Sequence, residues 1–124
     1  MMHAVFVVAE RGGWFAATTR CADTGEDPKT VAFPGGKIDP GETIREAAIR
    51  EAHEEGWEFR VVESDPFFVA EVEGKMVAWV RAFGPKKLLH FKEQNRLRNV
   101  MATAEKLSSQ NPAFRNAEAL KYHD

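Results

Sequence analysis

The first quarter of the chain alternates between short apolar runs and polar turns. His3–Ala9 is an apolar run of the kind that forms a buried strand. Glu10–Gly13 predicts a hairpin turn, because glycine adopts positive φ without steric cost, and the aromatic and β-branched run Trp14–Arg20 predicts the partner strand. The polar segment Cys21–Lys29 predicts a loop, and Thr30–Phe33 predicts a short strand.

Alternating apolar positions after the middle of the chain predict further strands. Phe59–Val62 and Phe67–Val72 have strand composition and are separated by a Ser-Asp-Pro break. The Glu-Gly-Lys turn at 73–75 would join the second of these to a strand at Met76–Phe83 as a hairpin. Lys86–Phe91 carries no clear period.

The C-terminal part of the chain has a helical period. The residues that recur on one face are Leu97, Val100, Met101, Ala104 and Leu107. Their spacing predicts a second long helix that begins near Lys92. Ser108–Pro112 is expected to close this helix, and the apolar positions Phe114, Ala117 and Leu120 predict a last short helical piece.

The strongest helical pattern lies between Thr43 and Glu55. Thr43 is a natural N-cap and Glu46 follows three residues later, so the pair forms a capping box. The apolar residues that follow are Ile44, Ala47, Ala48 and Ala52, and their spacing places them in one stripe. The sequence therefore predicts an amphipathic helix over these residues.

Three acids crowd the end of that helix. Glu51, Glu54 and Glu55 are spaced i, i+3 and i, i+4, so they project from one side of a single turn. Like charges at these spacings cost roughly 0.2–0.5 kcal/mol per pair. Clustered carboxylate oxygens suit a hard cation such as Mg²⁺, which takes one or two carboxylates together with substrate phosphate oxygens. We therefore expect a divalent cation at this turn, with Mg²⁺ as first choice and Mn²⁺ as an alternative.

Composition and element order point to one α/β domain. Strands surround the central helix and a second long helix follows, which predicts an α/β/α sandwich with a mixed sheet. A chain of 124 residues is enough for one domain, so residues 1–124 are expected to form a single unit. No run approaches the ~20 apolar residues of a membrane-spanning helix, and the net charge of −2 gives no bulk electrostatic reason to expect a membrane or nucleic-acid surface. Cys21 is the only cysteine, which fits a reducing cytoplasm.

The segment from Gly36 onward resembles the Nudix hydrolase signature. That signature is Gly, five residues, Glu, seven residues, Arg-Glu, an apolar residue, any residue, Glu-Glu, any residue, Gly and an apolar residue. The matching residues are Gly36, Glu42, Arg50, Glu51, Ala52, Glu54 and Glu55. The match breaks at Trp57, where the closing glycine would stand, because the glycine here is Gly56. Gly56 is still expected to be the left-handed residue that ends the helix, one position early.

The resemblance implies a Nudix-type sandwich and a role for each matching residue. Glu51, Glu54 and Glu55 would be metal ligands together with the carbonyl of Gly36, and Glu54 would also be the general base. Arg50 would orient the acids. Glu42 would make a structural hydrogen bond between loop and helix, and Gly35 would allow a close backbone approach.

Family members often add an acid from a later loop, and Glu93 is the candidate here. It follows the last predicted strand and precedes the second predicted helix. The alternative is a solvated first-turn glutamate that favours the helix dipole. Glu71 and Glu73 are weaker candidates because they lie near a hairpin turn.

A nucleotide substrate would need an aromatic surface for its base and cations for its phosphates. The available aromatic residues are Trp14, Phe15, Phe33, Phe67, Trp79, Phe83 and Phe91, and residues of this kind in strands are core by default. Arg20, Lys29 and Arg81 are candidate phosphate contacts, each with a solvated surface charge as the alternative.

The resemblance implies metal-dependent hydrolysis of the pyrophosphate bond in a nucleoside diphosphate linked to another group. Nucleoside triphosphates, nucleotide sugars or ADP-ribose, and dinucleoside polyphosphates are the candidate substrates. An alternative is hydrolysis at RNA 5′ ends, for which a basic channel could come only from Lys86, Lys87, Lys92, Arg96 and Arg98. A non-catalytic nucleotide-binding module is the third hypothesis. The sequence gives no indication of an oligomeric state.

Overall fold

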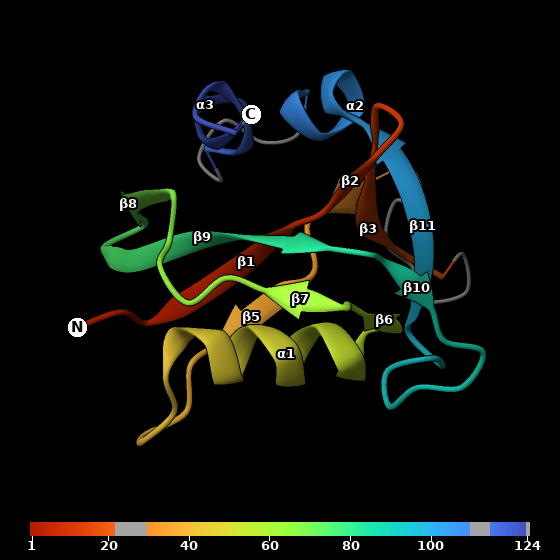
Figure 1. Ribbon diagram of the computed structural model, residues 1–124, viewed down its shortest axis with the longest axis horizontal. Helices are drawn as coiled ribbons and strands as arrows, with labels where there is room; N and C mark the ends of the chain where they lie inside the picture. Colours follow the sequence, from red (N-terminus) through yellow and green to blue (C-terminus); the bar gives the residue numbers. More distant parts are fainter. Residues whose placement is uncertain (22–29, 110–114, 124) are drawn as a thin grey trace.

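The computed structural model describes residues 1–21, 30–109 and 115–123, and a mixed sheet lies at its centre (Figure 1). The strand order is β5 (Gly35–Lys37), β1 (Ala4–Val8), β9 (Lys75–Phe83) and β7 (Val61–Val62), and β8 (Phe68–Val72) also pairs with β9. β1 and β9 are parallel, whereas the other pairs are antiparallel. The sheet is therefore mixed, as predicted.

Two smaller sheets complete the strand layer. One contains β11 (Leu97–Thr103), β3 (Trp14–Arg20), β2 (Glu10–Arg11) and β4 (Val31–Ala32). The other pairs β10 (Lys86–Lys87) with β6 (Trp57–Glu58). The turn predicted at Glu10–Gly13 is present, but its first two residues form β2, which pairs with β3 across the two glycines. The predicted pairing of the run His3–Ala9 with Trp14–Arg20 is wrong, because β1 pairs with β5 and β9.

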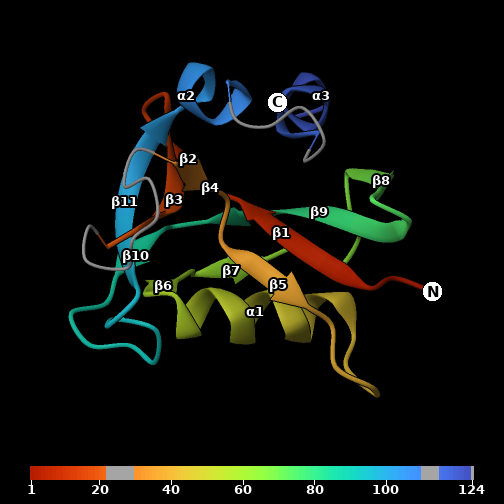
Figure 2. The same cartoon turned by 180° about the vertical axis from the view of Figure 1, so that it is seen from behind.

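Helices cover both sides of the strands. Helix α1 (Ile44–Glu54) lies on one side, while α2 (Ala104–Ser108) and α3 (Asn116–Lys121) lie on the other (Figures 1 and 2). One buried cluster contains the alanines of α1, and the second contains Leu107 of α2 and Ala119 of α3. The predicted α/β/α sandwich is confirmed. No helix in the described part of the chain has the length and hydropathy to span a membrane.

The amphipathic helix predicted from Thr43 is present with its capping box. The Thr43 hydroxyl accepts a hydrogen bond from the Glu46 amide at 3.0 Å, and the Glu46 carboxylate accepts one from the Thr43 amide at 2.9 Å. Ala47, Ala48 and Ala52 are fully buried against the sheet. Small side chains let the helix axis approach the strands closely, which brings the following acids next to β5.

The second long helix predicted from Lys92 is wrong, because most of that segment is strand β11. Residues 97–103 form an antiparallel ladder with all of β3. Met101 packs on the cluster that contains the alanines of α1, whereas Val100 and Ala102 pack on the cluster that contains Leu107 and Ala119. Burial on both faces puts apolar residues at positions that mimic a helical period, so periodicity alone misleads here. Helix begins only after Thr103, whose hydroxyl caps the amide of Lys106.

The strand predicted at Phe59–Val62 is also wrong in its bounds. Trp57 and Glu58 pair with Lys87 and Lys86 as β6, whereas Val61 and Val62 pair with Phe83 and Ala82 as β7. The segment that pairs with both strands, residues 82–87, bends at Gly84, which has φ +68°. Each short strand therefore follows a different side of that bend.

The other predicted strands and the hairpin at residues 73–75 are confirmed within one or two residues. The last helical piece is confirmed as α3. Residues 22–29, 110–112 and Phe114, for which a loop, a helix end and a helical position were predicted, lie outside the described residues.

Gly35 sets the separation between β5 and β1, and its replacement by alanine should destabilise the fold. An added Cβ would lie 2.0 Å from the Val5 carbonyl oxygen, and φ is +157°. Gly41→Ala is the control, because φ there is +87° but nothing lies within 4 Å of the added atom. We expect Gly41→Ala to cost about 1–2 kcal/mol for its backbone conformation alone, and Gly35→Ala at least about 3 kcal/mol. Urea unfolding measures both, and equal losses would contradict the role given to the Val5 contact.

Candidate active site

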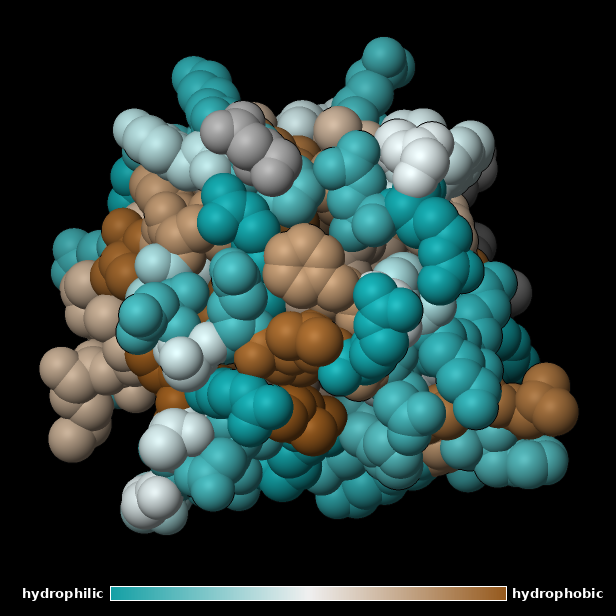
Figure 3. Space-filling model, viewed as in Figure 1, coloured by the Kyte–Doolittle hydropathy of each residue, from teal (hydrophilic) through white to brown (hydrophobic). Residues whose placement is uncertain are grey.

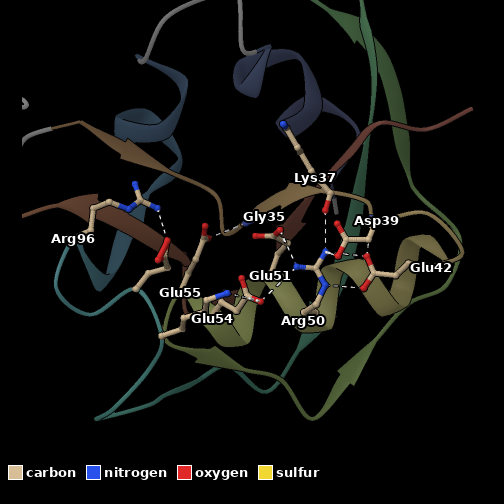
Figure 4. Close-up of polar contacts among 11 residues, drawn as sticks. Gly35, Lys37, Asp39, Glu42, Arg50, Glu51, Glu54, Glu55 and Arg96 are labelled. Atoms are coloured by element: carbon tan, nitrogen blue, oxygen red, sulfur yellow. Dashed lines mark hydrogen bonds and ion pairs between the residues drawn. The ribbon is translucent and has the colours of Figure 1, made fainter.

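The last turn of α1 carries its acids toward the glycines of β5 (Figure 4). The Gly35 amide donates a hydrogen bond to Glu55 Oε1 at 3.0 Å. A Cβ added at Gly36 would lie 2.5 Å from Glu51 Oε2, so only glycine leaves room for that carboxylate. The Pro-Gly-Gly segment therefore shapes the wall of a site, as well as joining two strands.

Arg50 holds the acid turn to the preceding loop. Its guanidinium binds Glu42 with two hydrogen bonds of 2.7 and 2.8 Å, from Nε to Oε2 and from Nη2 to Oε1. Its Nη1 atom lies 3.0 Å from Glu51 Oε1 and 3.5 Å from Glu54 Oε2. Its Nη2 atom also donates to the Lys37 carbonyl at 3.0 Å. These contacts connect Arg50 to the acids that it is predicted to orient, and the orienting role itself stays a prediction.

Glu42 is a structural acid that connects the loop to the helix. It accepts the two hydrogen bonds from Arg50 and one from the Asp39 amide at 2.8 Å. The Arg50 hydrogen bonds, followed by that from Asp39, lower the pKa of Glu42 to about 2. This carboxylate therefore stays ionised and bonded at neutral pH, in agreement with the predicted loop-to-helix hydrogen bond.

Burial acts in the opposite direction on Glu55. It raises the pKa of the Glu55 carboxyl group to about 8, and the hydrogen bond from Gly35 only partly offsets this effect. The charges of Glu51, Glu93 and Glu54 raise it further. Burial likewise raises the pKa of Glu51, against the lowering effect of Arg50. In the metal-free protein this site holds a proton near neutral pH.

The donor set fits a hard divalent cation. The last turn of α1 offers the carboxylates of Glu51, Glu54 and Glu55, and the partly buried Glu51 and Glu55 have raised pKa values that a nearby cation would lower again. Within residues 1–21, 30–109 and 115–123, no three acidic, histidine or cysteine side chains form a ready-made cage. Mg²⁺ needs no such cage, because it keeps several waters and takes substrate oxygens. The roles of these acids and of the Gly36 carbonyl as ligands stay predictions.

The structure brings Glu93 to this cluster, although it lies in a turn and not in a helix. Its amide donates to the Glu54 carbonyl at 2.9 Å, which attaches its loop to the end of α1. Its carboxylate binds Arg96 at 2.9 Å. The alternative of a helix first-turn residue is wrong, because no helix begins here. Glu71 and Glu73 are exposed on the β8–β9 hairpin.

Sequence reasoning missed two residues that position the Glu93 loop and Glu54. Asn99 on β11 donates through Nδ2 to the carbonyls of Gly56 at 2.7 Å and Leu88 at 3.0 Å. Lys92 places its Nζ 3.8 Å from Glu54 Oε2. Asn99 gave no signal because its segment was assigned to a helix, where it would have pointed elsewhere. Gly56 has φ +96° and follows the C-cap Glu55, so the early glycine does end the helix as predicted.

A cleft of about 260 Å³ opens beside Glu55 and Gly35. Aromatic wall comes from Phe33, which was among the predicted candidates, and from Phe6, which was not. Arg20 and Arg96 also line this cleft. Asn116 at the start of α3 is a further lining residue, and its amide nitrogen donates to the Leu107 carbonyl at 3.4 Å. No local pattern marks Asn116, because the packing of α3 alone places it there.

The other predicted contacts do not line this cleft. Phe15 and Trp79 are core residues, whereas Trp14 and Phe83 are half-exposed. Phe67 packs under the Arg81 guanidinium, which also binds Glu63 and the Tyr122 carbonyl. Phe91 lies against Gly56. Lys29 is outside the described residues.

The family model of the NUDIX domain matches residues 3–69. The chain belongs to the Nudix family. Family membership and the fold together make it a pyrophosphohydrolase. Comparison with curated proteins gives no match.

Solved structures of Nudix hydrolases share the fold. An ADP compounds hydrolase is 25% identical, with 96% of this chain and 69% of that chain covered and a TM-score of 0.65. The MutT NUDIX hydrolase from Burkholderia pseudomallei is 18% identical, with 100% and 99% covered and a TM-score of 0.72. A MutT structure from work on Aliivibrio salmonicida and Vibrio cholerae is 17% identical, with 98% and 95% covered and a TM-score of 0.70.

Replacing Glu55 by glutamine should stabilise the metal-free protein at alkaline pH. The pKa of Glu55 is about 8 in the folded state, whereas in the unfolded state it returns to the ordinary glutamate value of 4.5. The free energy of unfolding of the wild type therefore falls as pH rises through this window, and that of Glu55→Gln does not. We expect the variant to be more stable at pH 8 by on the order of 3 kcal/mol, with no such difference at pH 4.

Thermal unfolding in a chelator measures this difference, and Glu73→Gln on the exposed hairpin is the control. Saturating Mg²⁺ should reverse the order, because a bound cation stabilises the ionised carboxylate of the wild type. A wild-type stability that stays flat between pH 5 and 8 would contradict the pKa assigned to Glu55.

Proposed function

We propose that the protein hydrolyses a phosphoanhydride bond of a small nucleotide with the help of a divalent cation at the acid turn of α1. The observation that supports this is the position of Glu55. It lies between its neighbours Glu51 and Glu54 on one side and a cleft with aromatic and cationic walls on the other. A polyphosphate that reaches the acids from this cleft would leave its nucleoside against Phe6 and Phe33.

The cation would be held by Glu51, Glu54 and Glu55, with the Gly36 carbonyl and Glu93 as further ligands. When bound, it would neutralise phosphate charge and lower the pKa of a coordinated water. Mg²⁺ is the first choice and Mn²⁺ the alternative, because all these donors are oxygens. Glu93 would have to exchange its bond with Arg96 for such a role.

The residues of the chain supply orientation and proton transfer. Arg50 binds the carboxylates of Glu51 and Glu54 from one side, which restricts their rotamers next to Glu55, the acid that lines the cleft. Glu54 would accept the proton of the attacking water. Its carboxylate lies 3.5 Å from Arg50 and 3.8 Å from Lys92, so two cations hold it in place.

The size of the cleft favours a substrate with one nucleoside. A volume of about 260 Å³ lies at the low end for small-molecule sites. Nucleoside triphosphates and ADP-ribose-like compounds fit this limit, whereas a dinucleoside polyphosphate would leave its second nucleoside outside. The single cysteine suits a cytoplasmic setting for such substrates.

The five cations named for the RNA hypothesis, all in the described part of the chain, do not form a single basic channel. Lys92 and Arg96 pair with acids of the site, and Arg98 donates to the backbone carbonyls of residues 94 and 97. Lys86 and Lys87 line a separate hollow. RNA with a 5′-triphosphate therefore belongs in the substrate panel as an alternative.

A substrate panel with chromatographic identification of products tests the proposed activity. It should contain nucleoside triphosphates, ADP-ribose, nucleotide sugars, diadenosine polyphosphates and 5′-triphosphorylated RNA, each with Mg²⁺ and with Mn²⁺. We expect cleavage between phosphates, with a nucleoside mono- or diphosphate as product. Tight nucleotide binding without any product would support the non-catalytic module instead.

Glu54→Gln should lower kcat by about 10²–10⁴-fold with little change in KM, because the variant keeps the shape of the site but cannot accept a proton. His53→Gln is the matched control, since His53 is an exposed residue of the same helix turn. Steady-state kinetics on the best substrate of the panel measures both. Full activity of Glu54→Gln would exclude Glu54 as the base.

A further inference from the structure

A second hollow lies beyond the end of α1 and has no lining residue in common with the cleft. Its volume is about 540 Å³, and it forms where β6 and β10 meet residues of β2 and β11. Both ribbon views place β6 and β10 at the end of the molecule where α1 ends (Figures 1 and 2). The apolar part of its lining comes from Trp57, Pro85 and Met101, of which Trp57 is only 2% exposed.

All charged residues that line this hollow are cations: Arg11, Arg60, Lys86 and Lys87. In the described part of the chain, none of the four forms an ion pair with a carboxylate. Two acids lie near these cations, Glu10 next to Arg11 in the sequence and Glu58 in the ladder between β6 and β10. Glu10 is bound to His123 at 3.0 Å. Glu58 lies opposite Lys86 in the ladder of β6 and β10, and the two side chains form no ion pair in the structure.

The two arginines are held at the same turn. Arg11 donates from Nη2 to the Pro85 carbonyl at 2.9 Å. The Arg60 amide donates to the Phe83 carbonyl at 2.9 Å, and its Cβ lies 2.8 Å from the position of a Cβ added at Gly84. Gly84 therefore lets Arg60 pack directly against the turn that also binds Arg11. The hydrogen bond restricts the Arg11 side chain before any ligand binds, which lowers its entropic cost of binding, and the Gly84 turn fixes the backbone from which the Arg60 side chain extends.

Charge balance indicates the class of ligand. The whole chain has a net charge of −2, yet four cations without a carboxylate partner gather around one hollow, and hydrophilic residues dominate this end of the surface (Figure 3). Their mutual repulsion is relieved by an anion. One phosphate group carries about two negative charges, so four cations match two or more phosphates. Arginine is well suited to phosphate oxygens because its planar fork donates two parallel hydrogen bonds.

We propose that this basic hollow, lined by Arg11, Arg60, Lys86 and Lys87, is a second binding site for a di- or triphosphate group. The group would be carried by a free nucleotide or by the 5′ end of an RNA. The site takes no part in bond cleavage and is independent of the function assigned to the acid turn.

Titration with inorganic pyrophosphate in a chelator tests the site without contribution from bound metal. Calorimetry gives the Kd, and amide chemical shifts show which residues respond. We expect shifts at Gly84, Lys86 and Lys87 and not at Gly35 or Glu55. The double variant Arg60→Gln/Lys87→Gln should weaken binding roughly tenfold or more, because it removes two of four attractive charges. Both side chains are exposed, so the fold should be retained.

Lys75→Gln/Lys121→Gln is the matched control, because it also removes two exposed lysine or arginine charges but none from the hollow. Equal loss in both variants would mean that only net charge matters, and would overturn the proposal. Shifts confined to the acid turn would do the same. In further titrations, a nucleoside triphosphate is compared with RNA that carries a 5′-triphosphate and RNA that carries a 5′-hydroxyl. The ligand of the site is the one that binds more tightly and whose Kd rises when Arg60 and Lys87 are replaced.

Discussion

Repulsion between carboxylates on one turn of α1 is the constraint around which the rest of this structure is arranged. The Arg50 guanidinium answers it from within the chain, by binding Glu42, Glu51 and Glu54 at once. It does not reach Glu55, which accepts a hydrogen bond from the Gly35 amide instead. Similar glutamate side chains therefore differ in their pKa values. Hydrogen bonds from Arg50 and Asp39 lower the pKa of Glu42 to about 2, whereas burial raises the pKa of Glu55 to about 8, so a nearby cation would favour the charged form of Glu55.

The close approach of helix and strands makes this arrangement possible. Buried alanines bring α1 near the sheet, and two glycines bring β5 near both β1 and the acids. Both features lower the polarity around Glu55, and burial of a carboxylate is costly to the folded state. The site therefore lies where the fold gives up stability in the absence of a ligand, as functional sites commonly do.

The central part of the fold could be predicted from the sequence because its signals are local. The capping box at Thr43, the alanine stripe and the spacing of the acids all act within a few residues, and each is present in the structure. Strand β11 could not be predicted in this way, since its partner β3 is far away in the sequence and burial on both faces removes the alternation of a strand. Asn99 and Asn116 were missed for the same reason. Their contacts depend on which elements pack together, and neither residue type is diagnostic by itself.

The two hydrogen bonds of Asn99 have a mechanical consequence. They join Gly56, the second residue after α1, to Leu88 at the start of the loop that carries Glu93, and the Glu93 amide is bonded in turn to the end of the helix. These hydrogen bonds hold the acids at the end of α1 and Glu93 together as one rigid side of the cleft. Across the cleft, Asn116 belongs to α3, which no hydrogen bond among the described residues connects to α1, so adjustment to molecules of different width falls to that side. Selectivity for substrates would accordingly evolve by changes on the side of the cleft that faces the acids, while the acid side stays constant.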